Sequence, residues 1–156
     1  MAVSLSNEEV WSFLGAAPVG ILTTLRSDGF PVALPMWFVV LDRRVYIQTH
    51  VNTKKVGRIR RDPRASFLVE EGQRWAELKA VHLTGRVSIE DDPDVVRSAQ
   101  GLADEKYVEM RTAPEQLPDA TKRHYAPEMV TLRLDHDEKV LSWDNKKLHL
   151  KKSTGT

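Results

Sequence analysis

Short β-strand patterns separated by turn signals constrain the fold of this chain more than any other feature. The clearest pattern covers residues 81–89, where Val, Leu, Gly, Val and Ile alternate with His, Thr, Arg and Ser. Strict alternation is typical of an antiparallel strand that buries only one face. Further strand-like runs cover residues 19–25, 32–40, 45–49, 65–69, 130–134 and 140–143. We therefore expect at least six short strands in a mainly β fold.

Turn signals link most neighbouring strands into hairpins. The Ser-Asp-Gly turn at 27–29 separates the first two runs. The turn at 135–139 separates the last two runs, which we expect to pair with each other. Hairpin links favour an antiparallel sheet, and closure into a barrel removes the exposed edges of such a sheet. Pro35 lies inside the second run, and because proline cannot donate to a strand ladder, we expect an edge or a bulge there.

Helices are expected at the margins of this sheet. Ser6 and Glu9 form a capping box at the start of a helix over about 7–15. A second short helix begins after Asn52 or Thr53, either of which can cap it. The remaining predicted elements are a helix over about 93–110 and, over 111–127, a loop with a brief helical turn.

The composition narrows the possible functions. A chain of 156 residues fits one domain, which we expect to cover residues 1–145, followed by a basic tail at 146–156. The absence of cysteine excludes disulfides, thiolate metal sites and a cysteine nucleophile. With 23 basic and 22 acidic side chains, the net charge of +1 argues against a dedicated nucleic-acid binder. Neither a run of about 20 apolar residues nor a signal-peptide pattern is present, so we expect a cytoplasmic protein without a membrane partner.

The densest charged feature is the segment 53–64, which holds six basic residues and one acidic residue. Lys55 falls in the first turn of the predicted helix, where the helix dipole already disfavours a cation. A bound anion would explain a lysine there, because helix N-termini bind phosphate. The alternative is a solvated basic face that contributes only to solubility.

A second feature combines a proline with large apolar side chains at residues 34–38, Leu-Pro-Met-Trp-Phe. A kinked strand frees backbone polar groups beside an apolar surface, which suits a planar ring. The alternative is a bulged edge strand that packs its aromatic residues into the core. The five histidines share no metal-ligand spacing, and no hydrolase, P-loop or Rossmann motif is present, so we predict neither catalytic side chains nor a metal site.

In their order along the chain, these features resemble the pyridoxamine 5'-phosphate oxidase-like family, and within it the flavin/deazaflavin oxidoreductases of the FMN-binding split barrel type. The resemblance runs from about residue 8 to 90 and resumes at 140–144. The segments that carry it are 20–31, 34–38, 45–49, 53–55, 60–66 and 83–87.

The resemblance implies a six-stranded antiparallel split β-barrel with flanking helices. It also implies a homodimer that holds FMN or the deazaflavin coenzyme F-420 at each subunit interface. Lys55 would bind the cofactor phosphate, and Thr53 stands where many relatives carry an arginine. The other cofactor-binding residues implied are Thr53 and Lys54 beside the phosphate, Arg61 on the basic helix, Pro35, Met36 and Trp37 at the isoalloxazine edge, Gln48 and Thr49 at the ribityl chain and ring, and Trp75 from the other subunit.

The function that follows from the resemblance is hydride transfer between the bound cofactor and a small organic substrate, with the protein supplying position and electrostatics. One alternative is a non-catalytic flavin- or haem-binding split barrel that acts as a sensor or carrier. Another is a small barrel that binds nucleic acid through the basic segment, which the near-zero net charge disfavours.

Overall fold

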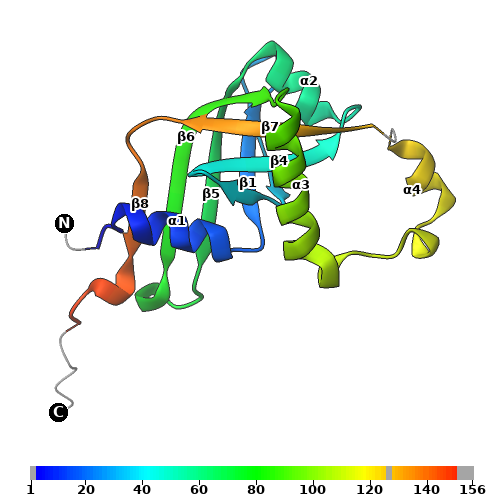
Figure 1. The fold of residues 1–156 in the computed structure, drawn as a ribbon. Coiled ribbons are helices and arrows are strands. Elements are labelled where there is room, and N and C mark those ends of the chain that lie inside the picture. Colours follow the sequence, from blue (N-terminus) through cyan, green and yellow to red (C-terminus); the bar gives the residue numbers. More distant parts are fainter. Residues whose placement is uncertain (1–2, 126–127, 151–156) are drawn as a thin grey trace.

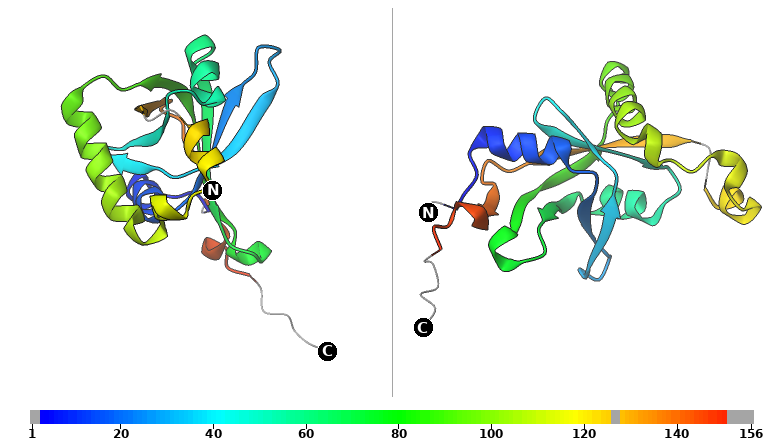
Figure 2. Two further views of the ribbon diagram at one scale, coloured as in Figure 1. Left: turned by 90° about the vertical axis from the view of Figure 1, so that its right-hand side faces the viewer. Right: turned by 90° about the horizontal axis from the view of Figure 1, so that it is seen from below.

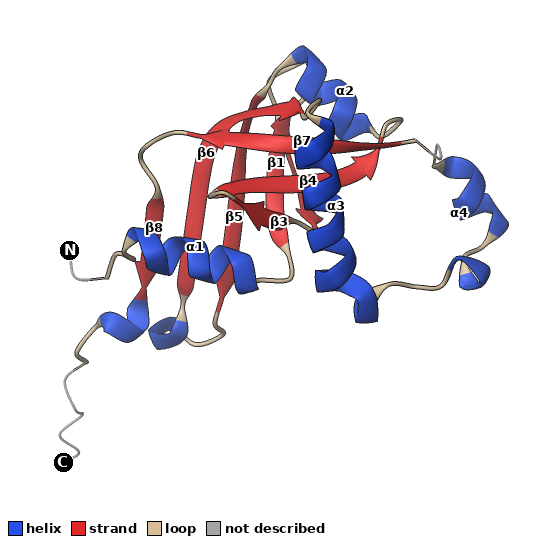
Figure 3. Ribbon diagram, in the orientation of Figure 1, coloured by secondary structure: helices blue, strands red, loops and turns tan. Residues whose placement is uncertain are grey.

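An antiparallel sheet of eight strands forms the body of the molecule, in a computed structural model that describes residues 3–125 and 128–150. The sheet curls strongly, and helices cover its margins (Figure 1, Figure 3). The predicted mainly β, antiparallel split-barrel fold is confirmed, with eight strands in the described residues where six were expected. The strands are β1 (Gly20–Leu25), β2 (Pro31–Met36), β3 (Val39–Leu41), β4 (Arg44–His50), β5 (Arg64–Glu71), β6 (Lys79–Ile89), β7 (Met129–His136) and β8 (Leu141–Asp144).

The strand order is β2-β1-β5-β6-β7-β4-β3, and β8 pairs with β6 beside this path. Four α-helices and four short 3-10 turns are described. They are α1 (Asn7–Ala16), α2 (Lys54–Arg61), α3 (Pro93–Tyr107), α4 (Asp119–His124), η1 (Trp75–Glu77), η2 (Val108–Met110), η3 (Pro114–Gln116) and η4 (Asn145–Lys147). The predicted capping box of α1 is present, with Ser6 and Glu9 bonded in both directions. No described helix has the length and apolar character needed to span a membrane.

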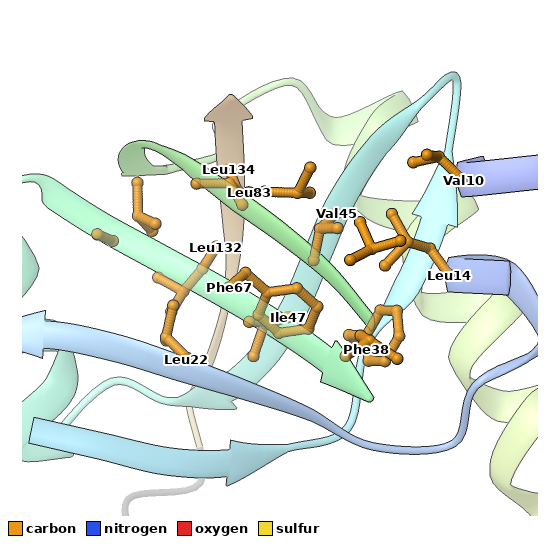
Figure 4. Close-up of a cluster of buried hydrophobic side chains, with 14 of the residues drawn as sticks. Val10, Leu14, Leu22, Phe38, Val45, Ile47, Phe67, Leu83, Leu132 and Leu134 are labelled. Atoms are coloured by element: carbon orange, nitrogen blue, oxygen red, sulfur yellow. The ribbon is translucent and has the colours of Figure 1, made fainter. Parts of the chain in front are cut away.

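The hydrophobic core lies inside the curl of the sheet and is closed by α1. Figure 4 shows Val10 and Leu14 of α1 facing side chains of the inner strands. Phe38 and Phe67 meet edge to face there, with ring centroids 4.8 Å apart. A second buried cluster fastens α3 to β3 and β4, because Ala99 and Tyr107 pack against the strands with Val39 and Tyr46. This packing fixes the position of α3 relative to the end of β4.

The predicted pairing of residues 140–143 with 130–134 is wrong, because β8 pairs with β6 instead. β6 is eleven residues long, and its two halves bond different partners. Its second half, Gly85–Ile89, pairs with β7, and its first half, Lys79–His82, pairs with β8. The two strands therefore follow one another along the same edge of β6, and residues 137–140 connect them without reversing the chain.

The run predicted at 32–40 is two strands, and the break falls after Pro35. Pro35 pairs regularly with Ile21 of β1. β2 is the first strand in the strand order and therefore an edge strand, so the predicted edge position is confirmed. The chain leaves the sheet at Trp37 and Phe38 before β3 begins. One face of β2 is exposed, whereas Val32 and Met36 on the other face are half-buried, and Figure 2 shows the β1–β2 hairpin projecting from the body of the sheet.

The helix predicted at 93–110 ends earlier, at Tyr107, and continues as the 3-10 turn η2. Its buried stripe consists of Ala99, Ala103 and Tyr107, whereas Leu102 is exposed.

The division of the chain at residue 145 stays a prediction. Within the segment expected to be a basic tail, the Lys147 ammonium donates to the Glu9 carboxylate at 2.6 Å and to the Ser4 carbonyl at 3.1 Å. This lysine is therefore tied to the start of α1, and residues 151–156 of the predicted tail lie outside the described part of the chain.

Candidate functional site

A cleft of about 740 Å³ lies where the end of β4, the start of α2, the middle of α3 and the segment 111–125 come together. Figure 1 shows this segment passing from α3 to α4, away from the sheet, before the chain returns in β7. The lining residues are Trp37, Phe38, Val39, Tyr46, Gln48, Thr49, His50, Thr53, Lys55, Gln100, Ala103, Tyr107, Arg111, Thr112, Pro114, Tyr125 and Met129. A smaller apolar cleft of about 280 Å³ lies between α1 and the strands β1 and β5.

Lys55 is the half-buried cation of the cleft. Its Nζ donates to Thr49 Oγ1 at 3.3 Å, and Thr49 Oγ1 lies 3.4 Å from Thr53 Oγ1. Burial lowers the pKa of the Lys55 ammonium, and the nearby Arg58 guanidinium lowers it further. No carboxylate in the described chain forms an ion pair with Lys55. A half-buried cation without a counter-charge, beside two hydroxyl groups, is suited to an anion.

The other cations of α2 point elsewhere. Arg58 Nε donates to Thr24 Oγ1 at 2.9 Å, and an Arg61 guanidinium nitrogen donates to the Leu25 carbonyl at 3.2 Å. Lys54 is exposed. Thr53 is the N-cap of α2 but makes no side-chain bond to the first turn, because its hydroxyl donates to the His50 carbonyl at 3.0 Å. The first turn therefore has no side-chain cap, which leaves its backbone N–H groups open to a ligand.

Trp37 and Tyr107 form the aromatic wall of the cleft. Their rings stack with centroids 4.4 Å apart and planes inclined by 4°. The Tyr107 hydroxyl accepts the Phe38 N–H at 2.9 Å and lies 2.8 Å from the carbonyl oxygens of Phe38 and Pro18. Lys106 adds a bond to the same Phe38 carbonyl at 3.0 Å, and burial lowers the pKa of this lysine to about 8. The break between β2 and β3 is therefore tied to α3 through these two neighbouring side chains.

Gln48 carries a buried polar group that the protein leaves unpaired. Its Nε2 atom is buried and has no hydrogen-bond partner among the described residues. An unpaired buried donor costs about 1–3 kcal/mol, which an acceptor on a ligand would remove. Gln48 is also one of the residues that line the cleft.

The structure brings together part of the predicted cofactor site. Trp37, Gln48, Thr49, Thr53 and Lys55 all line the cleft. The other predicted residues lie outside its lining: Pro35 and Met36 on β2, Lys54 and Arg61 on α2, and Trp75 on η1. The Trp75 side chain is 62% exposed, and its predicted role concerns a second subunit, so it stays a prediction.

Several cleft residues were not identified from the sequence. Tyr107 could have been found, because Ala99, Ala103 and Tyr107 follow one another at intervals of four on α3. Gln100, in the middle of α3, carries no such signal. Arg111 and Tyr125 carry none either, since they reach the cleft only through the path of the chain after α3. Tyr125 stacks on His50 with centroids 4.6 Å apart. No group of three or more potential metal ligands is found in the described residues.

Comparison with known proteins agrees with this geometry. The family model described as "Pyridoxamine 5'-phosphate oxidase" matches residues 6–135. The conserved hypothetical protein Rv2991 from Mycobacterium tuberculosis is 27% identical, with a TM-score of 0.80, and the match covers 99% of this chain and 94% of that one. An FAD-binding protein from Mesorhizobium loti is 24% identical, with a TM-score of 0.66 and coverage of 89% and 94%. The haem storage protein HutZ from Vibrio cholerae is 13% identical, with a TM-score of 0.67 and coverage of 88% and 94%. The chain therefore belongs to the pyridoxamine 5'-phosphate oxidase family and has the split-barrel fold.

Proposed function

We propose that this protein is a flavin- or deazaflavin-dependent oxidoreductase that holds FMN or coenzyme F-420 in the cleft. It would transfer hydride between that cofactor and a small organic substrate. The observation that carries the proposal is Lys55, a half-buried cation without a counter-charge that donates to Thr49. The FAD-binding relative from Mesorhizobium loti supports a flavin-type ligand.

The phosphate of the cofactor fits the region around Lys55. The Lys55 ammonium, the Thr49 hydroxyl and the uncapped first turn of α2 can all donate to one anion. A phosphate would also supply the counter-charge that the lysine lacks. Lys54 is exposed, and its role is a backbone donor rather than a charge partner.

The ring of the cofactor fits the adjoining part of the cleft. The unpaired Gln48 amide nitrogen can donate to a ring carbonyl, and the Trp37–Tyr107 stack offers a flat apolar surface. The cofactor supplies the hydride chemistry when bound, and the side chains bind it, orient it and exclude water. No carboxylate lines the cleft, in keeping with a site whose residues position the ring rather than transfer protons themselves.

A second subunit completes the proposed site. One face of β2 is exposed, and Leu34, Trp37 and Trp75 expose large apolar surfaces. In a homodimer, Pro35 and Met36 of β2 would present backbone atoms to the ring edge, and Trp75 would reach the site of its partner. Apolar surface of this kind is typical of subunit interfaces.

A non-catalytic flavin- or haem-binding carrier is the second candidate. His50 lines the cleft and offers an imidazole for haem iron, and the haem storage protein HutZ has the same fold. Absorbance spectra separate the candidates: purified protein is incubated with FMN, coenzyme F-420 or haemin and then freed of unbound ligand.

An oxidoreductase retains FMN or F-420 stoichiometrically and, once the cofactor is reduced anaerobically, passes the electrons to a quinone or nitroarene faster than free reduced cofactor does. Retention of haemin alone would refute the flavin proposal. Retention of flavin without faster oxidation by any acceptor would favour the carrier.

A further inference from the structure

The cleft contains a second cation that lies apart from the proposed phosphate position. Its charged lining residues are Lys55 and Arg111, and no Asp or Glu accompanies them. Lys55 belongs to the first turn of α2, whereas Arg111 follows η2 beyond the C-terminal end of α3. Figure 1 shows α2 and that end of α3 far apart, so the two cations serve different parts of the cleft.

Arg111 is held in place by a carboxylate outside the lining. Asp104 Oδ1 accepts from an Arg111 guanidinium nitrogen at 2.8 Å and from Gln100 Nε2 at 3.1 Å. Arg111 and Gln100 both line the cleft, so one carboxylate oxygen orients two donors that face the same space. A guanidinium has five N–H donors in a rigid plane, so the contact with Asp104 leaves others for a ligand.

The donor geometry of Arg111, rather than its charge, suits a carboxylate. Arg111 and Asp104 together carry no net charge, whereas Lys55 has no counter-charge. A dianionic phosphate therefore favours Lys55, while Arg111 offers a planar pair of donors that matches a carboxylate. The stack of Trp37 on Tyr107, the last residue of α3, presents flat rings to the same cleft.

We propose that Arg111 and Gln100, oriented by Asp104, bind the carboxylate of a planar aromatic substrate. This inference rests on the proposed function, which assigns the other end of the cleft to the cofactor. It assigns a substrate class to the oxidoreductase: aromatic or conjugated carboxylic acids, whose ring lies toward the cofactor and whose acid group lies toward the end of α3.

The test compares 2-naphthoate with its neutral analogue 2-naphthamide by calorimetry on the FMN-loaded protein. We expect the wild type to bind naphthoate at least about tenfold more tightly, because charge-assisted hydrogen bonds are the stronger ones. Arg111→Gln should abolish this preference. The control is Arg97→Gln, which removes an exposed arginine of α3 that is paired with Asp94, and it should keep the full preference.

FMN affinity is measured in the same variants. Arg111→Gln should leave it within about twofold of the wild type, because the phosphate is assigned to Lys55. Equal binding of acid and amide by the wild type, or a preserved preference in Arg111→Gln, would overturn the proposal. So would a loss of FMN affinity in Arg111→Gln as large as in Lys55→Ala, which would assign Arg111 to the cofactor. If neither FMN nor coenzyme F-420 binds the wild type, the proposed function fails, and the same titrations on the cofactor-free protein still decide whether Arg111 recognises carboxylates.

Discussion

Replacing Lys55 with alanine should weaken FMN binding far more than replacing its neighbour Lys54. Lys55 is half-buried in the cleft and has no acidic partner in the described chain, whereas Lys54 is exposed on the outer side of the same helix. A charge-assisted contact with phosphate contributes about 1.5–3 kcal/mol, which corresponds to about ten- to a hundredfold in affinity. An exposed lysine that is screened by solvent contributes much less.

The assay is titration of FMN fluorescence against wild type, Lys55→Ala and Lys54→Ala at one ionic strength. The thermal midpoint of each cofactor-free protein serves as the control for folding. Because burial disfavours the charged form of Lys55, its removal should not lower the midpoint of the cofactor-free protein. The stabilisation that saturating FMN gives the wild type should instead shrink in Lys55→Ala.

Equal losses of affinity in the two variants would refute the assignment of the phosphate to Lys55. They would mean that the helix presents its cations to FMN as a diffuse basic surface, for which the position of each lysine does not matter. A strong salt dependence shared by both variants would point the same way.

Four further outcomes are expected. Light scattering at micromolar concentration should report a homodimer, because Leu34, Trp37 and Trp75 expose apolar surface; a stable monomer would remove the proposed second half of the site. Tyr107→Phe should lower the free energy of unfolding by about 1–3 kcal/mol in urea, since the buried Phe38 N–H loses its partner, and an unchanged midpoint would contradict this. The pKa of Lys106 falls from 10.5 to about 8 on folding, so between these pH values the unfolded chain keeps a proton that the native state releases. The free energy of unfolding of the wild type, relative to that of Lys106→Met, should therefore rise as the pH increases across that interval. A difference that stays constant would contradict this. Alanine at His50 or His82 should lower kcat by less than about tenfold at saturating cofactor, and a loss of about a thousandfold at either histidine would show that the protein does its own proton chemistry.

Most of the fold could be predicted from the strand patterns, because these patterns depend on residues that are close together in the sequence. The alternation at 81–89, the capping box at Ser6 and the turn at 27–29 each reflect a local backbone preference, and the structure follows them closely. The partner of the strand at residues 140–143, in contrast, could not be predicted from residues close to it in the sequence. A hairpin with β7 and an extension along β6 use the same strand pattern, and the choice depends on β6 being long enough to pair with both strands.

The candidate site shows the same distinction between features set by nearby residues and features set by the whole fold. Lys55 could be singled out from the sequence, because a cation in the first turn of a helix is unfavourable without an anion. The family resemblance also implied Thr53 and Lys54 as residues beside the phosphate. Only the fold shows that Lys55 lines the cleft and that Lys54 faces solvent.

The sequence by itself determined a mainly β chain and a basic helix with Lys55 in its first turn, because these features arise from periodicity and spacing over a few residues. Only the tertiary structure decided what surrounds that position. Gln48 becomes an unpaired buried donor, Tyr107 stacks on Trp37, and Asp104 orients Arg111 toward the cleft. The stack of Tyr107 on Trp37 joins α3 to the segment between β2 and β3, which is far away in the sequence. These contacts depend on how the whole sheet curls, and no local pattern records that curvature.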